Sequence, residues 1–186
     1  MSNQPAVMAT AYHEAGHAVA AIMQGIAVHT VTIKPGDNYF GLTKHGKTRM
    51  DGFQPDYESV PPRVRDRMEK QARCALAGLI AQRRFSKSSI RQWHAHQDHR
   101  IAADLVSRLA HSIPETEAWL NLLHIQTEQI IDAHWYGVEA IAQALIKRTI
   151  LRGSEARALI RQAFQTWMNA ELARLGAQEG GNGIAQ

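Results

Sequence analysis

Two histidines four residues apart, with a glutamate directly after the first, are the residues of this chain best suited to chemistry. His13, Glu14 and His17 fit the pattern His-Glu-x-x-His. On a helix, four residues turn about 400° and rise about 6 Å, so both imidazoles emerge on one face. This spacing lets both rings reach one zinc ion at about 2.0–2.1 Å. Glu14 can then take a proton from a zinc-bound water, whose pKa the metal lowers towards about 7.

The pattern falls within a stretch that itself favours a helix. Residues Ala6 to Met23 are rich in alanine and carry apolar side chains at near-helical spacing. Chance supplies such a string in about 3% of shuffled chains of this composition. Two histidines one turn apart on an apolar helix also fit poorly as passive core residues. We therefore predict a Zn²⁺ site at His13 and His17 with Glu14 as the general base, and Gly16 leaves room for another backbone to approach.

A zinc site of this kind needs a third protein ligand, with the fourth position left for water or substrate. One short segment further along the chain offers four candidates: His94, His96, Asp98 and His99. Spacing alone does not choose among them. Asp98 also has a purely structural interpretation, as the N-cap of the helix that we expect from Asp98 to His111.

The remaining elements are predicted to be mostly helical. Two short strands, Val28–Lys34 and Tyr39–Lys44, are joined by a turn rich in Pro, Gly, Asp and Asn. A long loop follows to Pro62. Beyond it, apolar periodicity predicts helices over 63–85, 98–111, 115–148 with a break or bend at Gly137, and from Ser154 onward. The expected fold is mainly α (α+β): a helical, zincin-like single domain over 1–175, a small antiparallel β element near the active site, and a disordered tail over 176–186.

Composition limits the cellular setting and the partners. The 186 residues hold a single cysteine, Cys74, so no intrachain disulfide can form, and neither a leader nor an apolar run of about 20 residues is evident. We expect a cytoplasmic protein without a membrane span. The net charge is +4, and Arg63 to Arg91 holds nine Lys or Arg residues. This run favours the wet face of a helix over a nucleic-acid site, because no aromatic residues are interleaved for base stacking.

In the order of its motifs, the chain resembles the peptidase domain of the FtsH-type ATP-dependent zinc metalloproteases (peptidase family M41). The likeness runs from roughly Thr10 to Leu159. It includes the His-Glu-Ala-Gly-His form of the motif, the segments 29–35 and 41–43 as a strand pair, and Leu76-Ala77-Gly78 as a helix signature. Asp98, followed four residues later by an alanine, resembles the family's third ligand. The resemblance therefore implies zinc bound by His13, His17 and Asp98, beside a β edge to which an extended peptide could add.

The chain also departs from the family pattern. Leu79 replaces an arginine, and Gln82 and Arg83 replace paired acids. The family's membrane helices and its substrate-unfolding ATPase module have no counterpart here. We therefore expect a zinc metalloendopeptidase that cuts peptides or already unfolded proteins. A separate ATPase partner and a homo-oligomer are both compatible with this expectation. The alternatives are a catalytically inactive interaction module of the same fold and, further behind, a basic nucleic-acid-binding protein.

Overall fold

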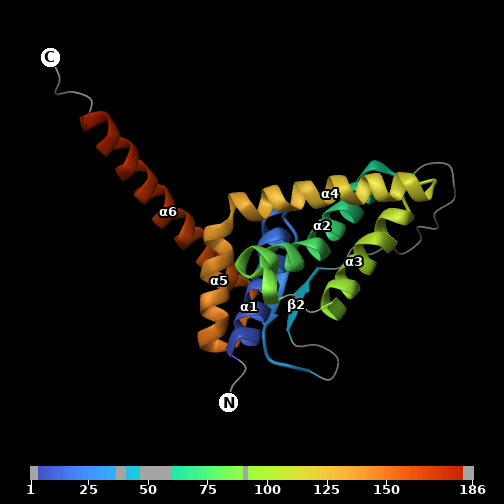
Figure 1. Cartoon of the computed structure of the whole chain (residues 1–186), viewed down its shortest axis with the longest axis horizontal. Coiled ribbons are helices and arrows are strands. Elements are labelled where there is room, and N and C mark those ends of the chain that lie inside the picture. The colour runs from blue at the N-terminus through green and yellow to red at the C-terminus, as the bar shows by residue number, and fades with distance from the viewer. Residues whose placement is uncertain (1–3, 37–40, 47–59, 90–91, 182–186) are drawn as a thin grey trace.

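The structure is a computed structural model that describes residues 4–36, 41–46, 60–89 and 92–181; for residues 4, 92–96 and 176–181 the description covers the backbone only. The molecule is mainly helical with one small sheet, as the sequence predicts (Figure 1). The helices are α1 (Gln4–Met23), α2 (Pro62–Phe85), the 3₁₀ turn η1 (Lys87–Ser89), α3 (Gln92–Ser107), α4 (Ile113–Ala133), α5 (Trp135–Arg148) and α6 (Gly153–Gly181). Helix α6 points away from the other elements (Figure 1).

Helix α1 lies at the centre and packs against α2 and α5. Many of its buried residues are alanines, so the neighbouring helix can approach closely. The closest approach is at Gly16, where a Cβ would lie 2.5 Å from the carbonyl oxygen of Ala77 and 2.6 Å from the Cβ of Ala81. The expected approach of another backbone at this glycine is therefore confirmed. The contact holds α2 against the face of α1 that carries the two histidines.

The sheet has three antiparallel strands in the order β2 (Leu42–His45), β1 (Val28–Thr32), β3 (Ile150–Arg152). Val31 of the central strand is fully buried and pairs with Thr43 on one side and Leu151 on the other. The sequence predicts only the first two strands. The third has three residues between two helices, too short for a β pattern, and it forms because β1 offers its backbone groups for pairing.

Two of the predicted helices, those over 98–111 and 115–148, differ from the observed ones in their boundaries. Helix α3 begins at Gln92 and not at Asp98, so Asp98 lies inside the helix and is not its N-cap. The predicted helix over 115–148 is two helices that meet at His134, three residues before Gly137. The chain turns there because α5 packs its own apolar face on α1. The first predicted boundary was wrong because residues 92–97 carry no apolar period.

The C-terminal segment also differs. Helix α6 continues to Gly181, whereas a disordered tail was expected from residue 176 onward. Ala, Gln and Glu after Gly176 are good helix formers, which favours continuation of the helix. Residues 182–186 lie outside the described part of the chain. Among the described helices, none combines the length and the apolar character that crossing a bilayer requires.

Candidate metal centre

Three ligand atoms from two helices converge at one point. Nε2 of His13 lies 3.0 Å from Nε2 of His17, both on α1. Oδ2 of Asp98, from α3, lies 3.1 Å from Nε2 of His13 and 3.3 Å from Nε2 of His17. The two histidine side chains are 9% and 12% exposed and that of Asp98 is 20% exposed, so the cluster is nearly closed but reachable.

Each imidazole is held through its second nitrogen. Nδ1 of His17 lies 2.7 Å from the backbone carbonyl oxygen of Cys74, and Nδ1 of His13 lies 3.1 Å from Oε1 of Gln82. A carbonyl oxygen only accepts, so Nδ1 of His17 carries a hydrogen, and Nε2 is the nitrogen left to bind a metal. Metal-binding histidines are typically held in this way by a carbonyl or carboxylate behind the ring.

These residues fit a zinc ion. Two imidazole nitrogens and a carboxylate oxygen, all within 4.8 Å of one another, form a donor set found in catalytic zinc sites with an open fourth position. Lone pairs that converge at about 3 Å repel each other unless a cation lies among them. The space for that cation is kept open by Gly78 on α2. A Cβ there would lie 2.8 Å from Nε2 of His13 and 2.6 Å from Cε1 of His17.

Without a metal, a proton takes the place of the cation among the ligand atoms. Burial lowers the pKa of His17, but the carboxylate of Asp98 outweighs burial and raises that pKa to about 9. Burial raises the pKa of Asp98, but His17 and His13 lower it by more than burial raises it. The pKa of Asp98 therefore lies below its ordinary value. The metal-free site therefore holds a protonated His17 against an ionised Asp98, and a metal must displace that proton.

Zinc affinity should consequently rise with pH. Because the pKa of His17 is raised to about 9, the ring is protonated below that pH and must lose its proton to bind zinc. We expect the apparent association constant to increase about tenfold per pH unit between about pH 7.0 and 8.5, with about one proton released per zinc. Chelator competition gives the slope, and calorimetry in buffers of different ionisation enthalpy counts the protons. A pH-independent affinity over this range would contradict the assignment.

Glu14, the predicted general base, is buried between α1 and β2. It is 5% exposed, and its Oε2 accepts a hydrogen bond of 2.7 Å from Oγ1 of Thr43, which also lies 3.1 Å from the Glu14 carbonyl oxygen. Gly41, just before β2, passes so close that a Cβ would lie 2.7 Å from Oε1 of Glu14. Burial raises the pKa of Glu14, with His17 and His13 opposing that rise. The carboxylate is thus held in one position and has an increased affinity for a proton.

The structure brings together four of the residues singled out in the sequence. His13, His17 and Asp98 form the cluster, and Glu14 lies beside it on α1. Among the other candidates for the third ligand, His99 is exposed and is not part of the cluster. The side chains of residues 94 and 96 lie outside the described part. Asp98 reaches the site because α3 packs against α2, which the sequence pattern does not reveal.

Sequence reasoning gave no role to four groups that shape the site. They are the Gln82 amide, the Cys74 carbonyl, the Thr43 hydroxyl and the missing side chain at Gly78. A signal was present for two of them. Gly78 lies in the Leu-Ala-Gly segment, and Gln82 follows one turn later at a position where the resembling family has an acid. The carbonyl and the hydroxyl gave no signal, because their roles depend on tertiary packing.

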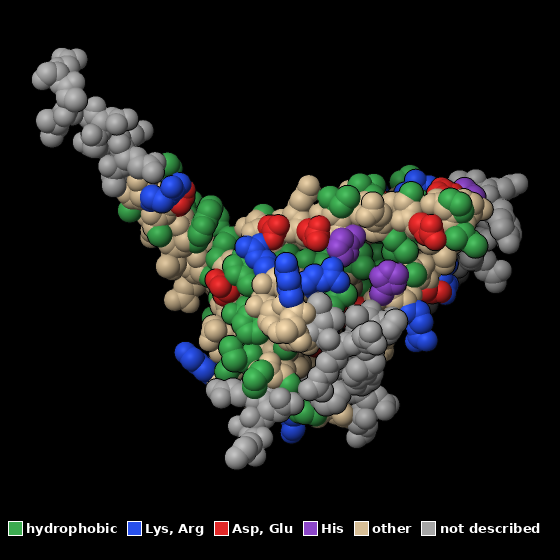
Figure 2. Space-filling view, viewed as in Figure 1, with side chains coloured by type: hydrophobic (Ala, Val, Ile, Leu, Met, Phe, Trp, Pro, Cys, Tyr) green, Lys and Arg blue, Asp and Glu red, His purple; other side chains and the backbone are tan. Residues whose placement is uncertain are grey.

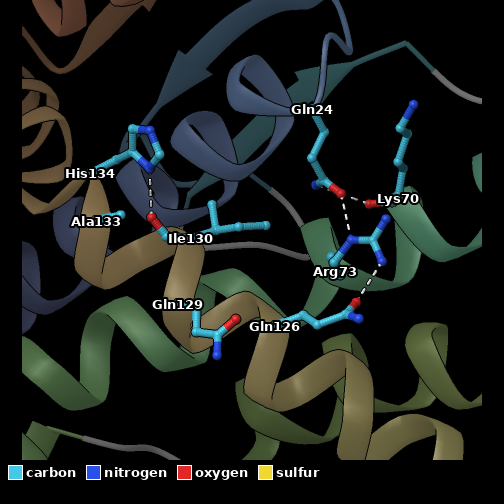
Figure 3. A pocket seen from close by; sticks show the side chains of 8 residues that line it. All are labelled: Gln24, Lys70, Arg73, Gln126, Gln129, Ile130, Ala133 and His134. Carbon is cyan, nitrogen blue, oxygen red and sulfur yellow. Dashed lines mark hydrogen bonds between the residues drawn. The ribbon is translucent and has the colours of Figure 1, made fainter.

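A separate open cavity lies between the end of α1 and helices α2 and α4 (Figure 3). It has a volume of about 500 Å³, and its lining residues are Gln24, Lys70, Arg73, Gln126, Gln129, Ile130, Ala133 and His134. Arg73 donates hydrogen bonds to the side-chain oxygens of Gln24 and Gln126, as Figure 3 shows. The two cations of the lining, Lys70 and Arg73, lie within ion-pair distance of Asp66 and Glu69, which partly neutralises their charge.

The basic run from Arg63 to Arg91 is likewise partly neutralised. Lys70 pairs with Asp66, Arg73 with Glu69, and Arg84 with Asp132 of α4. On the face drawn in Figure 2, Lys and Arg side chains lie next to Asp and Glu side chains along α4. Three of the nine basic residues in this run therefore have an acidic partner among the described residues.

Compared with known proteins, the chain matches no family model, and no curated protein matches it significantly. The resemblance to FtsH-type peptidases therefore stays an expectation from the order of the motifs. The function of the site has to be inferred from its own donors, their distances and their burial. Those observations describe a preformed N, N, O ligand set with a buried carboxylate beside it.

Proposed function

We propose that this protein is a zinc-dependent metalloendopeptidase that hydrolyses peptide bonds in peptides or unfolded chains. The observation that carries the proposal is the convergence of His13, His17 and Asp98 beside the buried Glu14. Bound at these three ligands, zinc would supply a Lewis acid for the scissile carbonyl and lower the pKa of a bound water. Neither the metal nor the activity is needed to explain the fold, since a chain of this length can bury its own core.

The protein's own residues would handle the protons. The Glu14 carboxylate takes a proton from the attacking water and returns it to the leaving amine. The raised pKa of Glu14 favours both halves of this exchange, because a base works best when its pKa lies near the working pH. Thr43 fixes one carboxylate oxygen by its hydrogen bond, which leaves the other oxygen for proton transfer.

We expect an extended substrate to bind at the edge of the sheet. Within the described residues, β2 pairs only with β1 and leaves its other edge open, and Thr43 of β2 contacts the general base. A peptide adding to this edge as a further strand would run past Glu14. A stably folded protein holds most of its backbone in its own hydrogen bonds, so we expect cleavage of unfolded chains unless a separate ATPase unfolds the substrate. Rapid cleavage of a stably folded protein by this chain alone would contradict that restriction.

Metal analysis combined with a cleavage assay tests the proposal. We expect about one zinc per chain and cleavage of an unfolded casein-like substrate that a chelator stops and added zinc restores. His17→Ala, which removes one ligand, should bind no zinc under the same conditions and should not cleave. Stoichiometric zinc without cleavage under several conditions would instead favour the inactive interaction module. Zinc-independent binding of nucleic acid that collapses with added salt would favour the basic binding protein.

A further inference from the structure

Gln82 connects α1, which carries two of the candidate metal ligands, to the short turn before α3, which carries the third. It lies on α2, one turn after Gly78, and is 7% exposed. Its Oε1 lies 3.1 Å from Nδ1 of His13, and its Nε2 donates a hydrogen bond of 2.8 Å to the carbonyl oxygen of Ser89. Ser89 ends η1, the short turn that precedes α3 and therefore Asp98.

The Ser89 carbonyl determines which way the Gln82 amide faces. A carbonyl oxygen can only accept, so the NH₂ group must face Ser89 and the amide oxygen must face His13. The amide oxygen can also only accept, so Nδ1 of His13 carries the hydrogen. The remaining lone pair of the ring is then on Nε2, the atom that faces His17 and Asp98.

We propose that Gln82 is a positioning residue of the metal centre: oriented by the Ser89 carbonyl, its amide holds His13 in the Nδ1–H tautomer and presents Nε2 to the metal. This inference rests on the metal site of the proposed function, but not on its peptidase activity. Each histidine has a partner at its Nδ1 atom, and the partner of His17 is a backbone carbonyl oxygen, which accepts the hydrogen bond. Gln82 is therefore the side chain through which this support can be tested.

The neutral amide has a specific consequence. A carboxylate behind a ligating histidine raises the basicity of the ring, whereas an amide orients it without adding charge. Here the negative charge of the site comes from Asp98 in the cluster itself. The centre is thus built with one charged ligand and neutral support behind both histidines.

Two substitutions at this position separate orientation from packing. Gln82→Met keeps the length of the side chain but removes both hydrogen bonds, and we expect zinc affinity to fall about 10–100-fold. Gln82→Glu keeps an acceptor for His13 and loses only the donor to Ser89, so we expect zinc affinity within about threefold of the parent or higher. Chelator competition on the full chain measures both affinities, and circular dichroism of the metal-free proteins compares their stability.

The pattern of the two variants decides the outcome. Both variants lose the bond to Ser89, so a role limited to that bond would lower zinc affinity in both of them and overturn the inference. Unchanged affinity in Gln82→Met would also overturn it. Long-range proton–nitrogen spectra of the zinc-bound parent should show the His13 hydrogen on Nδ1, and a hydrogen on Nε2 would contradict the proposal. Loss of affinity in Gln82→Met in a protein that cleaves nothing would leave this inference standing and remove only the peptidase function.

Discussion

Gly78→Ala is expected to abolish zinc binding while leaving the helices folded. The added methyl group would lie 2.8 Å from Nε2 of His13 and 2.6 Å from Cε1 of His17, in the space where the ligand atoms converge. The rings cannot simply rotate away, because Cys74 and Gln82 hold their second nitrogens. Alanine in the middle of α2 would itself favour the helix by about 1 kcal/mol. The loss should therefore appear in metal affinity and not in helix content.

We expect the zinc affinity of Gly78→Ala to fall by more than the 10–100-fold typical of losing an outer hydrogen bond to a ligand, to about 1,000-fold or beyond. Chelator competition measures this, with circular dichroism as the test of folding. Gly137→Ala is the matched control, since it adds a methyl group to a buried helical glycine whose nearest neighbours are side-chain atoms of Ile160 and Val19. It should bind zinc like the parent protein. Tight zinc binding by a folded Gly78→Ala protein would contradict the placement of the metal.

The two candidate ligands on α1 could be predicted from the sequence, whereas Asp98 was singled out only by the resemblance and not by its spacing. His13 and His17 lie within one alanine-rich apolar helix, so their common face follows from helix geometry alone. Asp98 reaches the cluster only through the packing of α3 on α2. The start of α3 was also misplaced, because its first turns have no apolar period, and this error had suggested a capping role for the aspartate.

The support behind the ligands was the least predictable part of the site. A histidine can be oriented by any acceptor that the fold brings behind it, and here one is a backbone carbonyl 57 residues away in sequence. The other is Gln82, which a comparison of motifs marks only as a departure from an acidic position. The same holds for Thr43, whose pairing with β1 places its hydroxyl on Glu14. Such contacts depend on how α2 and β2 pack on α1, and no local pattern encodes that packing.

Glu14→Gln should keep zinc and lose peptide cleavage. Glutamine has the same shape, and its side-chain oxygen can still accept the hydrogen bond from Thr43, so α1 and β2 should stay in place. The residue does not belong to the ligand cluster, so about one zinc per chain should remain bound. An amide cannot take a proton from water at neutral pH. We therefore expect kcat to fall by at least about 10²–10⁴-fold, the contribution of a positioned general base.

Thr43→Val provides the matched comparison for this loss. It removes the hydrogen bond that fixes the carboxylate but leaves the base itself, so activity should fall less than in Glu14→Gln. Initial rates on a fluorogenic peptide, measured beside the zinc content of each variant, distinguish the two effects. If Glu14→Gln turns over at the parent rate with its zinc in place, another group delivers the water, and the carboxylate that Thr43 and Gly41 enclose has a structural role instead. If Glu14→Gln loses its zinc as well as its activity, Glu14 supports the ligands on α1. The lower rate then reflects the missing metal and not a lost proton transfer.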